Sequence, residues 1–312
     1  MTAIIVVSAS IAYPADLKQN EYWADTMIDA ALRYDFKGIG LNYYEFGTGD
    51  PIIMLHGFGA SAYSFRKIAD LLTGNYRVIL IDMKGFGYSD KPKDDKYSAF
   101  DQAEIIASFI RGLSLQNVTL LGNSYGGGIA LFTCLRMQDE GNSPVKRLIL
   151  IDSAGYEQKI PFYIAVLRVP VICYIVMFLT PDKWNAGYVL QKAYFNDELI
   201  SEEMQKNYAA PLSTKGAGSA LISTADHLLD KDVMEMSKRY KEIEAPTLII
   251  WGEKDEIIPL FIGKRFDKEI PDSELHIFPE CGHVPQEEMP EKTVEVVKWF
   301  MGKVSPPFLK GE

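Results

Sequence analysis

Residues 122–126 read Gly-Asn-Ser-Tyr-Gly, so a serine stands between two glycines in the pattern G-x-S-x-G. An apolar run at 118–121 ends directly before this pattern, and a segment with helical periodicity begins at Tyr125. A tight turn from strand to helix strains the backbone of such a serine and exposes its Oγ at the carboxyl end of a sheet. The pattern predicts that Ser124 is a nucleophile, and an idle serine in a glycine-rich helix start is the plain alternative.

A serine hydroxyl needs an oriented base to take its proton before it attacks a carbonyl carbon. The chain has four histidines, and His283 follows an apolar run at 274–278, just before the last helical segment. That position places His283 at the same edge of the sheet as Ser124. Of the others, His56 is expected to support a loop, His227 lies in an inserted helical region, and His276 lies inside a strand. His283 is therefore the predicted base.

The histidine in turn needs a carboxylate that fixes its tautomer and stabilises the imidazolium. Asp255 follows the apolar run at 247–251 and is the predicted acid. Asp152 follows the run at 146–151 and is the competing candidate, because a carboxylate at that strand end also reaches the histidine.

Two backbone N–H groups are expected to hold the negative charge that develops on the attacked carbonyl oxygen. The first is the N–H of Tyr125, the residue after the nucleophile, and the second is the N–H of Phe58 in the His-Gly-Phe-Gly loop at 56–59. A glycine-rich loop can instead bind phosphate, but neither G-x-G-x-x-G nor G-x-x-x-x-G-K-[ST] occurs, so no nucleotide site is predicted.

From about residue 38, short apolar runs alternate with amphipathic segments. The runs are rich in Val, Ile and Leu without polar alternation, which indicates strands of a parallel sheet buried on both faces. They lie at 51–55, 76–81, 118–121, 146–151, 247–251 and 274–278, and the helix-like segments lie at 62–72, 99–112, 125–137, 260–268 and 291–301. This alternation predicts an α/β fold with helices on both faces of the sheet. Residues 41–46 are expected to form an antiparallel strand that precedes the parallel strands.

The alternation stops between residues 155 and 242, which read as helical and are interrupted by prolines. We therefore expect a core at 38–154 and 243–305, a helical cap at 155–242, an N-terminal extension at 1–37 and a tail at 306–312. Within the cap, residues 160–179 are apolar except for Pro161, Arg168 and Pro170. These three residues argue against a membrane span. The segment is expected to line the substrate pocket or contact a lipid surface, or simply to pack on the core.

The composition limits the class of protein and its partners. The chain has 312 residues, of which 47% are hydrophobic and 24% charged, as in an ordinary soluble globular protein. Its net charge of −10 repels a phosphate backbone, so no nucleic-acid partner is predicted. Cys134, Cys173 and Cys281 are far apart and show no ligand spacing, so no metal site is predicted. Free thiols are expected, with one disulfide as the alternative.

Residues 3–13 form a short apolar stretch with small residues near its end, similar to the central part of a secretory signal. No Lys or Arg precedes this stretch, so the positive start of a signal is missing. The expected location is cytoplasmic, and export or anchoring through residues 3–13 is the alternative.

Five motifs in this order resemble landmarks of the α/β-hydrolase superfamily. They are HGFGAS at 56–61, DMKGFGYSD at 82–90, GNSYG at 122–126, WGEKD at 251–255 and GH at 282–283. The chain order Ser124, Asp255, His283 also fits that superfamily. The resemblance implies a sheet of about eight strands, a helical cap inserted after the sixth strand, and no cofactor.

The resemblance also narrows the reaction. Haloalkane dehalogenases and epoxide hydrolases of this fold carry aspartate where this chain has Ser124. The resemblance therefore implies a carboxylesterase or lipase that cleaves a small-molecule ester with a hydrophobic acyl or alkyl group.

Two alternatives remain open. The motifs at 82–90 and 122–127 resemble serine C–C hydrolases of meta-cleavage products, which act on vinylogous diketones. Those enzymes usually carry Ser-Gly-Pro-Gly and a tryptophan where this chain has Phe58-Gly59-Ala60 and Val284. A ligand-binding homologue without turnover is the third reading.

Overall fold

The computed structural model describes residues 31–157, 161–169, 181–228 and 231–303. Within these ranges eight strands form one sheet in the order β1-β2-β4-β3-β5-β6-β7-β8. The pairs β1–β2 and β2–β4 are antiparallel, and all other pairs are parallel. The strands are β1 Leu32–Phe36, β2 Ile39–Phe46, β3 Pro51–Leu55, β4 Arg77–Ile81, β5 Val118–Asn123, β6 Val145–Ile151, β7 Thr247–Gly252 and β8 Ser273–Phe278. The predicted α/β sheet is confirmed.

The first strand begins earlier than the sequence suggested, inside the segment that was expected to be an N-terminal extension. Residues Lys37 and Gly38 join β1 to β2, and both have positive φ, 53° and 84°. A two-residue turn of this kind matches the twist of paired strands and connects them as a hairpin. The sheet therefore begins at Leu32, and the expected start of the core at residue 38 was too late.

Helices cover both faces of the sheet, and the strand residues alternate between the two faces. On β3, Ile53 and Leu55 face one core cluster, whereas Ile52 and Met54 face the other. The first cluster is completed by α3 Ala99–Gly112, α4 Tyr125–Asp139 and α11 Leu260–Glu269. The second is completed by η1 Ala62–Phe65, α2 Arg66–Leu72 and α13 Pro290–Gly302, next to which lies the short α12 Pro285–Glu288.

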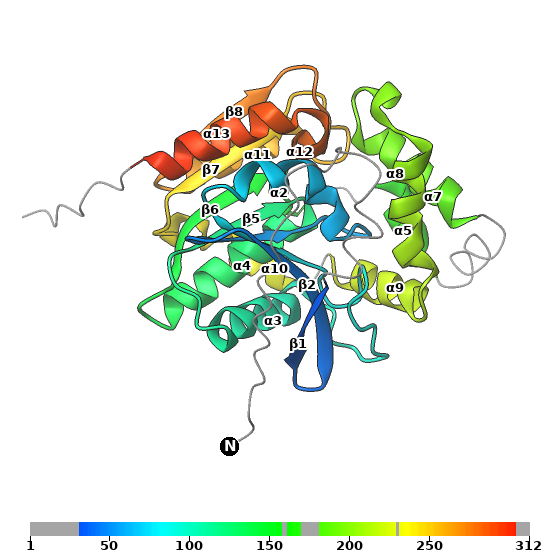
Figure 1. Cartoon of the computed structure of the whole chain (residues 1–312), viewed down its shortest axis with the longest axis horizontal. Coiled ribbons are helices and arrows are strands. Elements are labelled where there is room, and N and C mark those ends of the chain that lie inside the picture. The colour runs from blue at the N-terminus through cyan, green and yellow to red at the C-terminus, as the bar shows by residue number, and fades with distance from the viewer. Residues whose placement is uncertain (1–30, 158–160, 170–180, 229–230, 304–312) are drawn as a thin grey trace, which may run out of the picture.

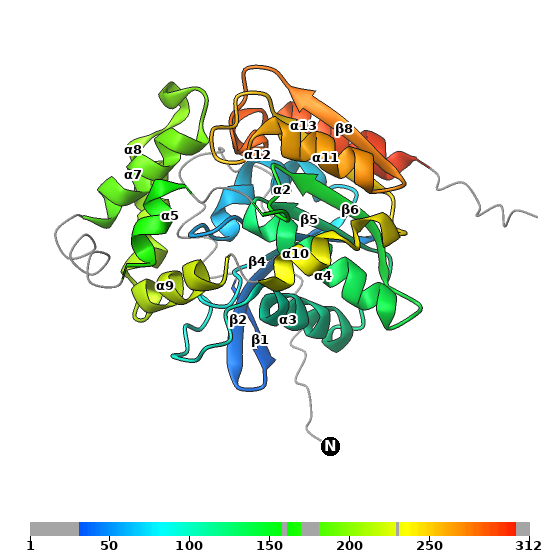
Figure 2. The ribbon, with the colours of Figure 1, turned by 180° about the vertical axis from the view of Figure 1, so that it is seen from behind.

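Most of the helical elements between β6 and β7 stand to one side of the sheet, at the right in Figure 1 and at the left in Figure 2. These are α5 Phe162–Leu167, α7 Asp182–Ala193, α8 Glu202–Ala209 and α9 Ala217–His227, whereas α10 Lys231–Ser237 lies against the core, where Met236 joins the first core cluster. This placement matches the cap expected after the sixth strand. No helix among the described residues is both long and apolar enough to cross a bilayer.

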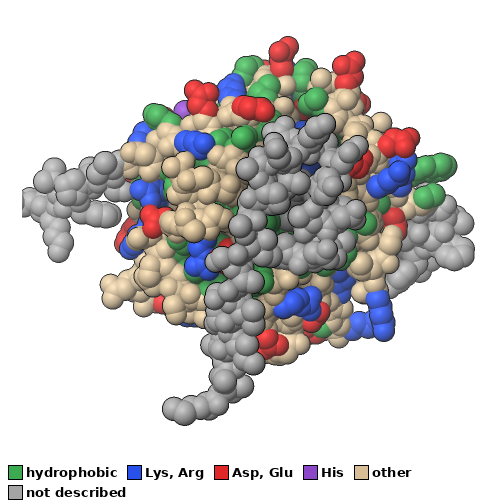
Figure 3. Space-filling view, in the orientation of Figure 1, with side chains coloured by type: hydrophobic (Ala, Val, Ile, Leu, Met, Phe, Trp, Pro, Cys, Tyr) green, Lys and Arg blue, Asp and Glu red, His purple; other side chains and the backbone are tan. Residues whose placement is uncertain are grey.

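Some of the expectations fall outside the described residues. These are the segment 3–13, most of the apolar stretch 160–179, Cys173 and the tail 306–312. Cys134 and Cys281 are buried free thiols. On the face drawn in Figure 3, Lys and Arg side chains are interspersed with Asp and Glu, and the coloured residues form no broad basic area.

Candidate active site

Ser124 lies at the turn between β5 and α4, with φ 55° and ψ −122°. A positive φ is rare for a residue with a side chain, and such strain is held only where surrounding contacts enforce it. Here the N–H of Ser124 donates to the carbonyl of Ile151 at 3.0 Å, and its own carbonyl accepts from Gly127 and Ala154, each at 2.9 Å. The strained turn is thus fixed from both neighbouring elements, and the half-buried Ser124 borders a cavity.

The glycines on either side of Ser124 allow this close packing. A Cβ on Gly122 would lie 2.3 Å from the carbonyl oxygen of Gly126, and one on Gly126 would lie 2.0 Å from that of Leu55. Both distances are far below van der Waals contact. Only glycine fits at these positions without moving the backbone, as the G-x-S-x-G pattern predicts.

Asp255 and His283 form a direct pair. His283 Nδ1 and Asp255 Oδ2 are 2.7 Å apart, and both side chains are buried. The other carboxylate oxygen of Asp255 accepts the N–H groups of Ile257 and Ile258 at 2.7 and 3.0 Å. With its proton on Nδ1, His283 keeps Nε2 free to act as a base.

The loop of the serine is also joined to the loop of the histidine. Asn123 Nδ2 donates to the main-chain carbonyls of His283 and Ile151, each at 3.1 Å. Among the described residues, no hydrogen bond joins Ser124 Oγ to His283. Catalytic hydrogen bonds of this kind often tighten only when substrate is bound.

The two expected oxyanion donors lie beside the same cavity. Phe58 and Tyr125 both border it, and their rings are 6.4 Å apart in an edge-on contact. Neither main-chain N–H donates to another group within the described part of the chain. The loop of Phe58 lies against the serine, since a Cβ at Gly57 would be 3.4 Å from Ser124 Cβ, an ordinary van der Waals contact. Both amides are therefore available to a carbonyl oxygen.

Asp152, the competing acid, is fully buried but makes no hydrogen bond to His283 within the described residues. Its Oδ1 accepts the N–H of Gly252 at 2.9 Å. One oxygen each of Asp152 and Asp255 and one ring nitrogen of His283 lie within 4.8 Å of one another. Such a cluster is compact enough to hold a metal ion, but the Asp255–His283 hydrogen bond already uses two of its atoms.

The other three histidines have other partners. His56 accepts the N–H of Met83 at Nε2, at 3.1 Å, so its Nδ1 carries the proton and donates to the carbonyl of Gly57 at 2.8 Å. Burial lowers the pKa of His56, which keeps it neutral in its supporting role. His276 lies in β8, as expected. His227, by contrast, borders the cavity from the cap.

The cavity beside Ser124 has a volume of about 90 Å³. Its wall comes from both core and cap and is mostly apolar, including Ile129, Phe132, Ile164, Leu228, Val233 and Ile257. Its polar side chains include Thr224 and His227 of the cap. Among the residues that the structure describes, the wall contains no Lys, Arg, Asp or Glu.

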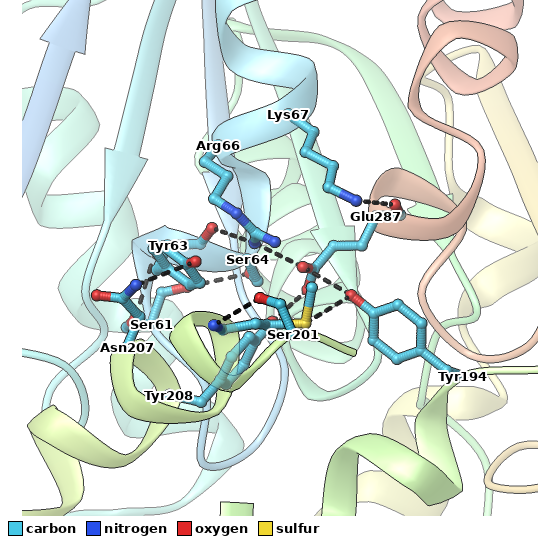
Figure 4. A network of polar contacts seen from close by, with 11 residues as sticks. Ser61, Tyr63, Ser64, Arg66, Lys67, Tyr194, Ser201, Asn207, Tyr208 and Glu287 are labelled. Atoms are coloured by element: carbon cyan, nitrogen blue, oxygen red, sulfur yellow. Dashed lines mark hydrogen bonds and ion pairs between the residues drawn. The ribbon is translucent and has the colours of Figure 1, made fainter. Parts of the chain in front are cut away.

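A buried polar network holds the cap on the core next to the histidine loop, as Figure 4 shows. At its centre Glu287, on α12, accepts hydrogen bonds from Tyr194 and Tyr208 of the cap and pairs with Arg66 of α2 at 2.5 Å. Lys67 donates to the main-chain carbonyl of Glu287 at 2.7 Å. Although burial opposes its charge, the Glu287 carboxylate holds the pKa of Arg66 above its usual value.

The cap also contacts the backbone of the predicted base. The N–H of His283 donates to the carbonyl of Ala193 at the end of α7, at 2.6 Å. Glu288 accepts the N–H of Gly282 with one oxygen, at 2.7 Å, and that of Phe195 with the other, at 2.9 Å. The position of His283 therefore depends on where α7 ends.

Sequence reasoning missed Asn123, Glu287 and Glu288. Asn123 stands inside the G-x-S-x-G pattern, and the two glutamates follow the histidine within five residues. A pair of acidic residues so close to the base was a usable signal, but their partners on the cap become visible only in the fold.

The comparisons with known proteins agree with this fold. The family described as alpha/beta hydrolase fold matches residues 50–213 and 206–290. The chain is 30% identical over 277 residues to 2-hydroxymuconate semialdehyde hydrolase of Pseudomonas putida, which covers 85% of this chain and 92% of that protein.

Two solved structures have similar folds. A mutant form of the meta-cleavage product hydrolase CumD superposes with a TM-score of 0.76 at 26% identity, covering 89% of this chain and 100% of that chain. The esterase EaEST from Exiguobacterium antarcticum gives 0.71 at 28% identity, covering 85% and 97%. From the family match and the extent of these similarities, the chain belongs to the alpha/beta hydrolase family.

Proposed function

We propose that this chain hydrolyses carboxylic esters with an apolar acyl or alkyl group, through an acyl-enzyme on Ser124. The observation that carries this proposal is the apolar cavity beside Ser124, whose described wall contains no Lys, Arg, Asp or Glu. Such a cavity favours a neutral, apolar group on the substrate, because an anion buried there would lack a cation to compensate for its lost hydration.

The reaction follows from the groups that surround Ser124. His283 Nε2 takes the hydroxyl proton while Oγ attacks the ester carbonyl carbon, and Asp255 stabilises the imidazolium that forms. The N–H groups of Phe58 and Tyr125 hold the oxyanion. As the tetrahedral intermediate collapses, His283 returns its proton to the leaving alcohol. Water then attacks the acyl-enzyme through the same base and releases the acid.

The named relatives favour a second candidate, hydrolysis of a C–C bond in a meta-cleavage product. 2-Hydroxymuconate semialdehyde hydrolase and the meta-cleavage product hydrolase CumD are both similar to this chain over most of its length. The same serine, base and oxyanion donors suit attack on a ketone carbonyl, with an enolate leaving in place of an alcohol. A muconate carries a carboxylate, however, and the described wall of the cavity offers no Lys or Arg to receive it.

One paired experiment decides between the candidates. Rates are measured on p-nitrophenyl esters from acetate to palmitate and, in parallel, on a 2-hydroxy-6-oxo-2,4-dienoate, with wild type and Ser124→Ala. The proposal expects ester turnover that exceeds dienoate turnover and that falls by several orders of magnitude in the variant. Faster dienoate turnover would replace the ester reading with the C–C reading. Absence of turnover on both, with the substrates still bound, would favour a ligand-binding homologue.

A further inference from the structure

Asp152 is a buried carboxyl group for which the reaction above has no use. It follows β6 with a positive φ of 42°, in the region that disfavours residues with side chains, and its side chain is completely buried. One oxygen, Oδ1, accepts the N–H of Gly252 at 2.9 Å. The other oxygen, Oδ2, is buried without a hydrogen-bond partner in the described part of the chain. A buried ionised oxygen without a partner is costly, so its state needs an explanation.

The surroundings of Asp152 are acidic. Asp255 reaches within 4.8 Å of it, and Glu288 and the Cys281 thiol also lie close enough to interact electrostatically. His283 can become positive in this cluster, but its Nδ1 is already bonded to Asp255. No Lys or Arg among the described residues pairs with Asp152. Two carboxylates this close in a buried site do not both ionise, because each disfavours the charge of the other.

Of the two, Asp255 is the better carboxylate. It accepts two backbone N–H groups at one oxygen and His283 Nδ1 at the other, and these three donors stabilise its negative charge. Asp152 accepts one backbone N–H and has an oxygen left over. The proton that the pair retains therefore belongs on Asp152, where it gives Oδ2 a hydrogen to donate.

We propose that Asp152 is a neutral carboxylic acid that donates a hydrogen bond to the carboxylate of Asp255 and so positions the Asp255–His283 pair. Burial, together with the charge of Asp255, raises the pKa of Asp152 well above its usual value, which agrees with this assignment. The role as a positioning residue rests on the proposed functions of Asp255 and His283, but the protonation state does not.

The assignment predicts which substitution Asp152 tolerates. Asparagine has the shape of a protonated aspartic acid, so its carbonyl can still accept from Gly252 and its NH₂ can still donate to Asp255. Alanine removes the donor, which leaves Asp255 more negative and the imidazolium of His283 more stable. The acid limb of the pH profile of kcat/KM then moves to higher pH in Asp152→Ala, whereas it stays in place in Asp152→Asn.

The decisive experiment measures the proton directly. Infrared difference spectra of the whole protein at neutral pH compare wild type with Asp152→Asn, and Asp139→Asn, an exposed aspartate at the end of α4, is the control. A protonated-carboxyl C=O stretch present in wild type and in the control but missing from Asp152→Asn is expected. Its absence from wild type overturns the proposal, and so does a tightly held divalent cation found by elemental analysis, because a metal needs both carboxylates ionised.

Kinetics on whichever ester or dienoate is turned over then test the positioning role. Asp152→Asn is expected to keep kcat/KM within about threefold of wild type, and Asp152→Ala is expected to lose tenfold or more. An equal, large loss in both variants, with no infrared band, would make Asp152 an ionised participant instead. An unmoved acid limb in Asp152→Ala would reduce Asp152 to a packing role. If wild type turns over neither the esters nor the dienoate, the proposed function is wrong, but the infrared test of the protonation state remains valid.

Discussion

The side-chain amide of Asn123 donates a hydrogen bond to the main-chain carbonyl of His283, with an Nδ2–O distance of 3.1 Å. Asn123 is the residue directly before Ser124, and its amide also donates to the carbonyl of Ile151 at 3.1 Å. The loops that carry nucleophile and base are therefore joined by one buried side chain. Small errors in the separation of reacting groups are costly in catalysis, so this link has a kinetic consequence.

Asn123→Ala removes both hydrogen bonds and leaves the buried carbonyl of His283 without this partner, whereas the carbonyl of Ile151 keeps the N–H of Ser124. Each lost buried partner costs about 1–3 kcal/mol, and part of that cost falls on the placement of His283. We expect kcat on the preferred substrate to fall roughly tenfold or more, at about 1.4 kcal/mol per factor of ten, with a much smaller change in KM. The control is Asn75→Ala, which changes an exposed residue in the turn between α2 and β4. A kcat within twofold of wild type in Asn123→Ala would show that the link is dispensable.

Much of the fold could be predicted from apolar runs, because strands buried on both faces leave a continuous signature. The run at 51–55 coincides with β3, and the segment at 99–112 coincides with α3. The strand β1 was missed because Leu32–Phe36 alternates between half-buried and exposed residues at the edge of the sheet. Its signal was the Lys37-Gly38 turn, which has meaning only once the strands on both sides are recognised.

The candidate site was predictable to the level of residue types and strand ends. Ser124, Asp255 and His283 each follow a strand of the sheet, so parallel topology alone brings them to one edge. The choice between Asp255 and Asp152 was not predictable in the same way, because both meet that condition. It depends on which carboxylate reaches Nδ1, and the structure gives that contact to Asp255 at 2.7 Å.

Two glycines of α4 offer a matched test of the serine turn. A Cβ at Gly126 would meet the carbonyl oxygen of Leu55 at 2.0 Å, whereas one at Gly128 has its nearest neighbour at 3.5 Å. Gly126→Ala is therefore expected to destabilise the fold or displace the turn, with loss of activity. Gly128→Ala is expected to raise stability by up to about 1 kcal/mol, because alanine favours a helix. Thermal unfolding of both variants checks this contrast, and equal effects would contradict the close-packed turn.

Because Gly128 also borders the cavity, its substitution has a second effect. The added methyl group occupies space that substrate would otherwise use. In the ester series, Gly128→Ala should therefore move the preferred chain length toward shorter acids. An unchanged chain-length profile would mean that the acyl group lies elsewhere in the cavity.

The Arg66–Glu287 pair is expected to be important for stability. Arg66→Met leaves the buried Glu287 carboxylate without its cation, and removing one partner of a buried pair costs about 3–5 kcal/mol. The same change in the exposed Arg33–Asp90 pair, Arg33→Met, should cost no more than about 1 kcal/mol. Urea unfolding of both variants measures the difference. Comparable losses at the two sites would show that Glu287 is neutralised by other means.

The stability of Asp152→Asn relative to wild type should depend on pH in a defined direction. The raised pKa of Asp152 means that the folded chain binds a proton that the unfolded chain releases above about pH 4. Wild type therefore loses stability from this group as pH rises toward its folded pKa, by about 1.4 kcal/mol per pH unit, whereas asparagine has no proton to lose. The free energy of unfolding of Asp152→Asn should therefore rise relative to that of wild type between pH 5 and 7.

Asp139→Asn supplies a control of opposite sign for this measurement. The hydrogen bond from Arg239 lowers the pKa of Asp139 in the folded chain. The stability that Asp139 contributes is therefore fully present above its pKa in the unfolded chain and is lost as the pH falls through the lower pKa of the folded chain. Between pH 5 and 7 the difference between wild type and Asp139→Asn should therefore stay flat. If the Asp152→Asn difference is also flat over that range, Asp152 folds as an ordinary ionised carboxylate, and its proton cannot be what holds Asp255 against His283.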